Sequence, residues 1–492
     1  MQNLISSIYS QDLERLENST TNKKLNLITF RSQDGVEFAV RPDTSNPTGD
    51  RIGGVFSNSN IRRKYAESGH RLKSKELDDI NEDLKSAAHA HGFTASVWYR
   101  VAQIPNGIEI DLGDERHRRI AVTPGRVEML NSGSQSVFVR NPHMGGISVP
   151  EDVSSGDLSK FDKYLNMTPE SKILILAWLT FSMAQPKVEN SKFPILVLSG
   201  SQGTGKTVMS KLLLKFADPG SIGVRTFPSN QKELAIACQS SHVLAYDNLR
   251  FLSPVMADAL CIAATGGSIT VRQLYTDAEV MAIRLHGAVI LNGLHPFINQ
   301  SDLAQRCLTI ELLPISKAMR QTDAELQGQL HQDYPDIYFG LLDLIAKVFA
   351  VLPDIKVKEA ERMAEFSKWL AAMEVVQGVP EGTYQKYYSD QIVNGQLDAL
   401  QDNLLGSEIL AFAKLQERPW IGTPTKLYED LSAFAVTRIG RSREWPDNAI
   451  AMSKRLMPLV ASLEAQGIGI QFKRGKRRQI IITNDDIDGD LY

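Results

Sequence analysis

Residues 200–207 have the types and spacing that could bind the phosphates of a nucleotide. In order, they are Gly200, Ser201, Gln202, Gly203, Thr204, Gly205, Lys206 and Thr207. They match the pattern G-x-x-x-x-G-K-[ST] at every fixed position. Glycines let backbone N–H groups wrap phosphate oxygens, the lysine brings a charge to the β- and γ-phosphates, and the threonine hydroxyl is a ligand for Mg²⁺. The pattern therefore predicts a site for ATP and Mg²⁺.

The elements that must position this loop are a strand before it and a helix after it. Residues 195–198 are continuously apolar and have the length of a buried strand. Residues 208–216 carry apolar side chains at helical spacing, and the pattern stops at Asp218, Pro219 and Gly220. A chance glycine turn is the alternative, but the order strand, glycine-rich turn and helix is the context that a phosphate-binding loop requires.

An aspartate at the end of a second apolar run is the next candidate. Asp247 ends the run 243–246, which is the layout of a Walker B strand, so we expect Asp247 near the Mg²⁺ that Thr207 binds. A glutamate commonly follows this aspartate as the base that activates water, but here the next residue is Asn248. Asn248 is a candidate catalytic residue because an amide can orient water. It cannot accept a proton, so the catalytic base stays open.

Three further motifs follow in a set order. A segment of the form T-G-G-x-x-x-x-R ends at Arg272, an apolar run ends at Asn292, and Arg306 stands directly before the next apolar run. Together with the phosphate loop and the aspartate-ended strand, this order resembles the superfamily 3 helicases. These are AAA+ motors of small DNA viruses, phages, plasmids and integrated mobile elements. The resemblance covers roughly residues 150–320 and rests on five ordered motifs.

The resemblance implies roles for these residues. Lys206, Thr207 and Asp247 would bind nucleotide and metal, and Asn292 would be sensor 1, a side chain that positions the attacking water. Arg306 would be an arginine finger that reaches the γ-phosphate of a neighbouring subunit. An arginine supplied by another subunit requires a homo-oligomer, and head-to-tail contacts close into rings, here expected to be hexameric. The alternatives are a turn-forming Asn292 and a surface Arg306.

The resemblance also implies that residues 266–279 form a hairpin that enters the ring's pore and grips single-stranded DNA. Arg272 and Tyr275 are the candidate contacts, and Tyr275 could stack on a base. Helicases of this type commonly carry lysines near the hairpin tip, whereas this segment has Asp277 and Glu279, which would repel phosphate. The departure leaves open whether the hairpin moves along DNA.

The residues after the expected ATPase core are mostly helical in pattern. Residues 316–405 are interpreted as a helical lid, in which Arg362 is an ion-pair partner on a helix surface, with a second nucleotide sensor as the alternative. Helices are expected at 407–416, 425–436 and 447–466, and Pro458 should split the last of these.

Two short strands follow these helices, at 468–472 and 478–483, which completes the layout of a winged helix. Its basic residues are candidate DNA contacts, because Lys and Arg side chains can neutralise phosphates. They are Lys454, Arg455, Lys473, Arg474, Lys476, Arg477 and Arg478. Ordinary surface charge is the alternative.

The N-terminal 150 residues show no group of side chains with an evident catalytic use. Alternating apolar and polar segments between turns predict antiparallel strands, and Asp34 and Gly35 predict a hairpin turn. The basic clusters 62–64 and 117–119 are interpreted as solvated surface charge, with contact to nucleic acid as the alternative.

The totals are those of a globular protein with several domains. The chain has 492 residues, of which 42% are hydrophobic and 23% charged, and a net charge of −3 argues against a wholly basic coat for nucleic acid. Three widely spaced cysteines, the absence of a signal-peptide pattern and the absence of a long apolar run indicate a cytoplasmic protein without a membrane partner.

The predicted fold is α/β, a P-loop AAA+ ATPase core with an N-terminal α+β domain, a helical lid and a C-terminal winged-helix domain. The expected segments are an N-terminal domain (1–150), a helical connector (151–192), the core (193–315), the lid (316–405), the winged helix (406–484) and an acidic flexible tail (485–492).

The favoured function is an ATP-dependent, ring-forming helicase or translocase that acts on single-stranded or forked DNA in the replication of a phage or mobile element. The alternative is an ATP-regulated DNA-binding scaffold or regulator, with phage defence as one setting, that does not unwind DNA. The complete motif order favours the first function, whereas Asn248 and the hairpin without lysine favour the second.

Overall fold

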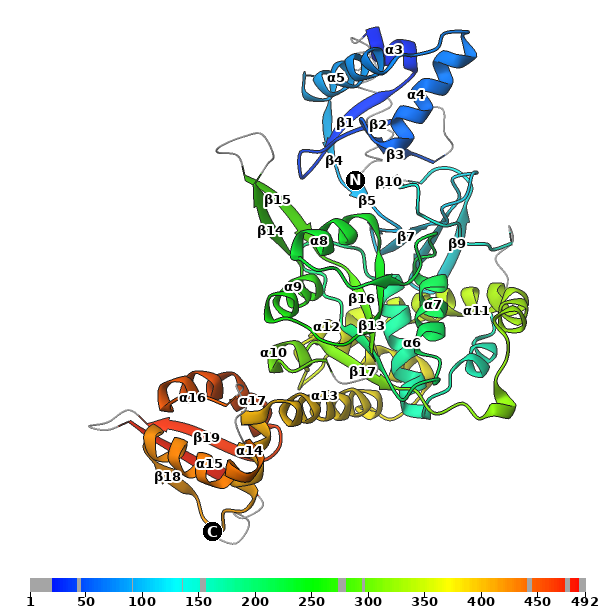
Figure 1. Cartoon of the computed structure of the whole chain (residues 1–492). Helices are drawn as coiled ribbons and strands as arrows, with labels where there is room; N and C mark the ends of the chain where they lie inside the picture. The colour runs from blue at the N-terminus through cyan, green and yellow to red at the C-terminus, as the bar shows by residue number, and fades with distance from the viewer. Residues whose placement is uncertain are drawn as a thin grey trace.

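The computed structural model describes residues 20–41, 46–90, 92–134, 136–150, 156–272, 280–293, 297–439, 445–473 and 478–485. Within them the chain is a mixed α/β protein, as the sequence predicts (Figure 1). No helix in these ranges is long and apolar enough to cross a membrane.

A sheet of five parallel strands lies at the centre of the molecule. The strands are β11 (Ile195–Ser199), β12 (Arg225–Thr226), β13 (Val243–Leu249), β16 (Ala288–Gly293) and β17 (Cys307–Glu311). Their spatial order is β12-β13-β16-β11-β17, and every neighbouring pair is parallel. The apolar runs of β11 and β16 are buried almost end to end, as is usual in parallel sheets. Because these strands are parallel, the loops that follow β11, β13 and β16 all lie at the carboxyl end of the sheet.

Short helices connect and cover these strands. They are η1 (Leu158–Tyr164), α6 (Pro169–Ala184), α7 (Lys206–Ala217), α8 (Gln231–Ser240), α9 (Pro254–Thr265) and α10 (Ser301–Ala304). Two of these elements lie in the helical connector expected over residues 151–192. Helix α6 begins at Pro169, and its N-cap Thr168 accepts a hydrogen bond from the Ser171 N–H. The segment before it is the 3-10 helix η1.

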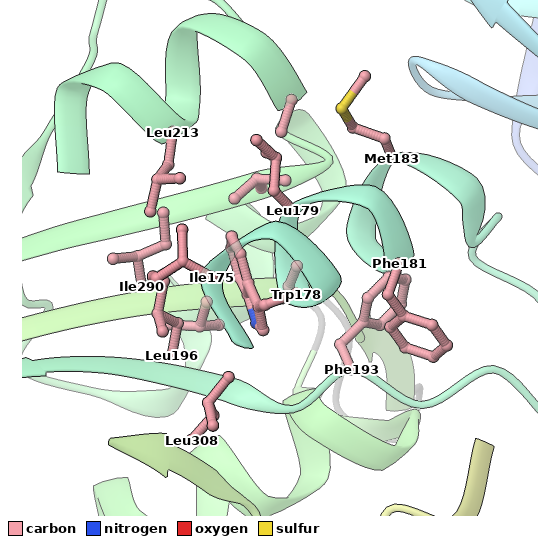
Figure 2. Close-up of a cluster of buried hydrophobic side chains, with 14 of the residues drawn as sticks. Ile175, Trp178, Leu179, Phe181, Met183, Phe193, Leu196, Leu213, Ile290 and Leu308 are labelled. Atoms are coloured by element: carbon pink, nitrogen blue, oxygen red, sulfur yellow. The ribbon is translucent and has the colours of Figure 1, made fainter. Parts of the chain in front are cut away.

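Helix α6 is buried almost all round and fills the space beside the sheet. Figure 2 shows Ile175 and Trp178 beside Leu196 of β11 and Ile290 of β16. Trp178 is fully buried, and its indole N–H donates to the Pro194 carbonyl at 2.7 Å. The helix therefore fixes the start of β11, and through it the position of the phosphate loop, by packing within its own chain.

A two-stranded hairpin extends from the central sheet (Figure 1). It consists of β14 (Gly267–Arg272) and β15 (Val280–Leu285), which pair antiparallel from Gly267 with Leu285 to Arg272 with Val280. A hairpin in this region is as expected. Its tip, with the candidate residue Tyr275 and the acidic Asp277 and Glu279, lies outside the described residues.

The N-terminal part contains two sheets and three helices among its described residues. One sheet has the order β4-β1-β2-β3-β10-β5 and the other is the antiparallel meander β6-β7-β8-β9. The elements are α3 (Thr20–Leu25), β1 (Ile28–Ser32), β2 (Glu37–Val40), β3 (Thr48–Arg51), α4 (Val55–Glu67), α5 (Ser74–Ala90), β4 (Phe93–Ala95), β5 (Val97–Trp98), β6 (Val101–Ile104), β7 (Gly107–Asp111), β8 (Arg119–Thr123), β9 (Arg126–Leu130) and β10 (Val137–Val139).

The hairpin predicted at Asp34 and Gly35 is confirmed, because β1 and β2 pair antiparallel around them. The antiparallel strands expected from the alternating segments are confirmed in the meander β6–β9. Elsewhere in this part, β1 with β4, and β10 with both β3 and β5, pair parallel. The helix α5 stands between β2 and β4 in the chain, and a connection of that length allows two strands to run in the same direction.

One of the two N-terminal basic clusters is not solvated. Arg119 is fully buried and its Nη1 lies 2.5 Å from the Asp111 Oδ1, while Arg118 pairs with Asp114 at 2.5 Å. The interpretation of residues 117–119 as solvated surface charge is therefore wrong. The acids that pair with these arginines come from a neighbouring strand and turn, and their positions depend on the folded sheet.

Helices dominate the chain after the central sheet. They are η2 (Lys317–Met319), α11 (Asp323–Val351), η3 (Leu352–Asp354), α12 (Ala364–Gln377) and α13 (Thr383–Asp402). A capping box at Thr322 and Glu325 begins α11. The inner side of α13 joins the large core with Tyr384, Tyr388 and Ile392, whereas Leu400 belongs to a separate core formed by the C-terminal residues.

The C-terminal part packs around its own three-stranded sheet, of order β18-β20-β19. Its elements are α14 (Leu404–Lys414), β18 (Trp420–Gly422), α15 (Pro424–Ile439), α16 (Ala449–Leu456), η4 (Met457–Leu459), α17 (Val460–Glu464), β19 (Ile468–Lys473) and β20 (Gln479–Asn484). The predicted break at Pro458 is confirmed, because a 3-10 turn separates α16 from α17 there. Strand β18 was not expected. Asp485, the first residue of the expected tail, donates its N–H to the Gly467 carbonyl, and the rest of the tail lies outside the described residues.

Candidate nucleotide-binding site

The loop between β11 and α7 depends on three glycines with positive φ. Gly200, Gly203 and Gly205 have φ values of 130°, 82° and 86°, which residues with a side chain rarely adopt. A methyl group added to Gly200 would lie 2.8 Å from the Leu312 carbonyl oxygen. The loop can therefore turn back toward the first residues of α7 only with glycine at these positions.

Lys206 reaches back across the loop that it ends. Its side-chain Nζ donates to the carbonyls of Gly200, at 2.6 Å, and Ser201, at 2.9 Å. Only 8% of the residue is exposed. Burial lowers the pKa of Lys206, and the negative charge of Asp247 opposes this change. The ammonium group is thus held inside the turn where phosphates would be bound.

Thr207 and Asp247 meet at the same edge of the sheet. The threonine hydroxyl donates to Asp247 Oδ2 at 2.7 Å, which joins the first turn of α7 to the end of β13. Hydroxyl and carboxylate oxygens are ligands that Mg²⁺ prefers. The two residues that the sequence assigns to the metal are therefore together, and their chemistry fits Mg²⁺.

Asn292 lies at the end of β16, between α7 and β13. Its Nδ2 donates to the Ser210 hydroxyl at 3.0 Å, and its Oδ1 accepts the backbone N–H of Asn248 at 3.2 Å. Ser210 in turn donates to the Lys206 carbonyl at 3.1 Å. Because Asn292 is only 1% exposed, its amide acts on the site through Ser210 and Asn248.

Asn248 occupies an unusual backbone conformation next to Asp247. Its φ is 60°, in the left-handed region, and its side chain is exposed. Asparagine tolerates this conformation better than most residues with a side chain. The turn directs the Asn248 N–H toward Asn292, and the register between β13 and β16 shifts between Tyr246 and Leu249.

Arg306 lies at the end of the sheet opposite the phosphate loop, where the parallel strands begin. Its carbonyl accepts the N–H of Ile195, the first residue of β11, whereas the loop begins after Ser199, the last. A strand rises roughly 3.3 Å per residue, so roughly 16 Å of β11 separates Arg306 from the loop of its own chain.

The Arg306 side chain takes part in a local ion-pair cluster. It pairs with Asp302 at 3.3 Å and is 13% exposed, and Arg362 pairs with the same carboxylate at 2.5 Å. The interpretation of Arg362 as an ion-pair partner is confirmed, although Arg362 precedes α12 rather than lying on it. The cluster joins two arginines to one carboxylate, away from the phosphate loop.

The candidate DNA contacts belong to the β14–β15 hairpin, to α16 and to the β19–β20 hairpin. Arg272 ends strand β14, but its side chain and all of Tyr275 lie outside the described residues. Lys454 and Arg455 are exposed in the last turn of α16. Lys473 and Arg478 are exposed at one end of the β19–β20 hairpin, and the residues between them, including Arg474, Lys476 and Arg477, lie outside the described part of the chain.

Sequence reasoning missed Asn166, which fastens the phosphate loop from outside the motif. Its Nδ2 donates to the carbonyls of Thr204, at 2.8 Å, and Leu313, at 3.0 Å. Its own carbonyl accepts the Leu313 N–H at 2.8 Å. No motif marks Asn166 in the sequence. Ser210 was also missed, but its place one helical turn after Lys206 is a signal that could have found it.

Two family models match the sequence side by side. Residues 160–394 match the model described as "Actinomycete integrative conjugative element replication protein", and residues 405–488 match the model described as "AICE RepA C-terminal domain". No curated protein matches the sequence. Over its central and C-terminal parts, the chain is thus similar to a replication protein of a mobile element.

Solved structures also match, with little similarity in sequence. "The A form apo structure of NrS-1 C terminal region-CTR" is 13% identical with a TM-score of 0.37, and the match covers 95% of this chain and 98% of that chain. "The A form apo structure of NrS-1 C terminal region-CTR(305-718)" is 14% identical with a TM-score of 0.39, covering 95% and 99%. These TM-scores are too low to establish a common fold.

Proposed function

We propose that this chain, which matches the models of a mobile-element replication protein, is an ATP-dependent DNA helicase or translocase that works as a ring. The observation that carries the proposal is the meeting of Lys206, Thr207 and Asp247 at one sheet edge. The three residues come from the loop, α7 and β13, and their groups are those that bind phosphate and Mg²⁺.

Each residue of this group has a task in hydrolysis. Lys206 would leave its two carbonyl partners for the β- and γ-phosphates, and the loop N–H groups would bind the remaining oxygens. Thr207 and Asp247 would hold Mg²⁺, which supplies positive charge opposite the phosphates. Asn292 would hold Asn248 in a fixed position relative to α7, so that the exposed Asn248 amide can orient water.

Arg306 supports assembly into a ring. Arg306 lies at the end of the sheet opposite the phosphate loop of its own chain. Its side chain would therefore contact a nucleotide only in a neighbouring subunit. A head-to-tail contact would place the Arg306 end of one subunit's sheet against the phosphate-loop end of the next. When this contact repeats around an axis, the subunits close into a ring. The arginine cluster at Asp302 would open toward the neighbour's γ-phosphate and stabilise the charge of the transition state.

The separate C-terminal core supports the last boundary of the domain assignment. We propose that residues 193–315 are a P-loop AAA+ core and residues 406–484 a winged helix, joined by the lid helices 316–405. The C-terminal residues pack around a core of their own, distinct from the large one. The exposed Lys454 and Lys473 of the proposed winged helix would contact DNA phosphates. The hairpin β14–β15 would contact DNA in the pore of the ring.

A second function is favoured by the residues around Asn248. The position that commonly carries a glutamate has an amide, and Asn292 uses its own amide on Ser210 and on the Asn248 N–H. A site built this way would bind ATP well and hydrolyse it slowly. In that case the chain would be an ATP-regulated DNA-bound scaffold that does not unwind DNA.

Hydrolysis of ATP by purified protein tests the proposed site. The wild-type chain should hydrolyse MgATP, and Lys206→Ala should lose hydrolysis and keep its melting temperature, because the hydrogen bonds that the described residues show for the Lys206 ammonium group go to loop carbonyls. Lys211→Ala is a matched control, since this exposed lysine lies on the same helix. Hydrolysis at the wild-type rate in Lys206→Ala would contradict the assignment of the site.

A further inference from the structure

The segment that follows β17 lies along the phosphate loop. A methyl group added to Gly205 would lie 3.5 Å from Ile315 Cδ1, and one added to Gly203 would lie 3.4 Å from Arg320 Nη2. Residues of the segment 312–320 thus approach all three positive-φ glycines of the loop. This segment lies outside the motifs found in the sequence.

Hydrogen bonds at both ends of the loop hold this segment in place. The Leu312 N–H donates to the Ser199 carbonyl at 3.0 Å. Leu313 donates its N–H to the Asn166 carbonyl and accepts a hydrogen bond from the Asn166 side-chain amide. Asn166 also bonds the Thr204 carbonyl at 2.8 Å, so one side chain ties the loop to the segment. The approach of Arg320 to Gly203 is therefore built into the fold.

Within the described part of the chain, the guanidinium group of Arg320 is free to bind an anion at this position. It is exposed, and the described residues show neither an ion pair nor a hydrogen bond for it, in contrast to Arg306 and Arg362. The nearby carboxylate of Glu325 is occupied by the N–H and hydroxyl of Thr322 in the capping box of α11.

We propose that Arg320 binds the phosphates of the nucleotide held by the loop of its own chain. The inference rests on the proposed nucleotide site and adds to it a second cation beside Lys206. An arginine can form two parallel hydrogen bonds to phosphate oxygens, whereas a lysine supplies a point charge. Because α11 begins three residues later, at Asp323, phosphate held by Arg320 also fixes the start of the helices proposed as the lid.

The test is calorimetric binding of MgATP to the full chain, at a protein concentration where light scattering shows monomers. Hydrogen bonds to charged groups contribute about 1.5–3 kcal/mol, so Arg320→Ala should weaken MgATP binding roughly 10- to 100-fold. Arg320→Lys should recover part of the loss. Lys317→Ala, which removes an exposed cation from the same segment, should bind within about twofold of wild type.

Each result has a distinct meaning. Equal binding by Arg320→Ala and wild type would overturn the inference, and so would a loss that is equal for Lys317→Ala, since that loss would reflect general charge. A loss seen only in the assembled protein would place Arg320 at a neighbour's site and overturn the assignment to its own chain. If Lys206→Ala binds MgATP as tightly as wild type, the proposed site itself fails, whatever Arg320 does.

Discussion

Asn292 shows how a buried residue can support the proposed nucleotide site from behind it. Its amide joins Ser210 of α7 to the backbone of Asn248 on β13, and it is almost fully buried. A buried amide that loses one partner leaves another polar group unpaired, which costs free energy. The role that the family resemblance implies, positioning water, would therefore be exerted through Asn248.

Substitution of Ser210 separates this role from direct contact with water. Ser210→Ala removes the bond to Asn292 and should lower kcat for ATP hydrolysis several-fold with little change in KM, because Asn292 loses its anchor on α7. Asn292→Ala should lower kcat further and reduce the free energy of unfolding by about 1–3 kcal/mol.

Ser453→Ala serves as the control for Ser210→Ala. Ser453 makes the same kind of bond to a carbonyl one turn earlier, in α16, without contact to the site. Its removal should leave kcat unchanged. A Ser210→Ala protein with wild-type kcat would show that the Asn292–Ser210 bond has no part in hydrolysis.

The residues of the loop could be predicted because their chemistry needs local spacing. The meeting of Thr207 with Asp247 could be predicted as well, since parallel strands bring their carboxyl ends to one edge. Asn166 and Arg320 could not, because they reach the loop from segments whose path depends on tertiary packing. Neither residue has a neighbour in the sequence that marks its use.

At the scale of elements, a buried charge cluster holds the N-terminal sheets together. Asp111, at the end of β7, pairs with Arg119 at 2.5 Å and Arg140 at 2.7 Å, and it is fully buried. Arg119 also reaches the Thr48 hydroxyl of β3 at 3.1 Å. Three strands and the segment after β10 therefore depend on one carboxylate.

The pKa of Asp111 predicts how stability changes with pH. Burial raises this pKa, but Arg140 and Arg119 outweigh burial and lower it to about 2. A depressed pKa gives stability that is present above the ordinary aspartate value and is lost as pH falls from about 4 toward 2. The full effect is on the order of 2 kcal/mol.

Unfolding by urea at a series of pH values would measure this effect. Asp111→Asn should be less stable at pH 7 and should lack the part of the decline between pH 4 and 2 that Asp111 contributes. Asp390→Asn, which breaks an exposed pair with Lys386, is the control and should follow the wild-type curve. A wild-type slope in Asp111→Asn would contradict the assignment.

Elements with a strong local pattern were predictable, and elements that exist through pairing were not. The Thr-Pro start of α6 and the break at Pro458 follow from local sterics and capping. Strand β18 has only three residues and becomes a strand by pairing with β20. The parallel pairing of β10 with β3 joins residues about 90 positions apart, which no local pattern encodes.

At the scale of the whole molecule, the phosphate loop and Arg306 lie at opposite ends of the strands of one sheet. That placement makes the loop and the arginine of a single chain unable to act on the same nucleotide. Two chains in head-to-tail contact would bring them together, and the hydrolytic site would then be complete only in the assembly.

Mixing two inactive variants tests this arrangement. Arg306→Ala should bind ATP and hydrolyse it poorly, and Lys206→Ala should fail through its own loop. A mixed oligomer contains some interfaces with an intact loop facing an intact arginine, so part of the ATPase activity should return. The recovery should grow with protein concentration, because it depends on assembly.

Arg362→Ala is the matched control in the same cluster. It removes a second arginine from Asp302 and should keep more activity than Arg306→Ala if Arg306 is the residue that reaches the neighbour. Co-assembly of the variants, confirmed by light scattering, without any return of activity would exclude an arginine supplied by a neighbouring subunit.

Strand displacement on a forked DNA decides whether the chain is a motor. Purified wild-type protein with MgATP should release the labelled strand over time, and release should stop without ATP and in Lys206→Ala. The Lys211→Ala control should release the strand as wild type does. A wild-type protein that binds the fork and hydrolyses ATP, yet releases no strand, would contradict the motor and leave the ATP-regulated scaffold.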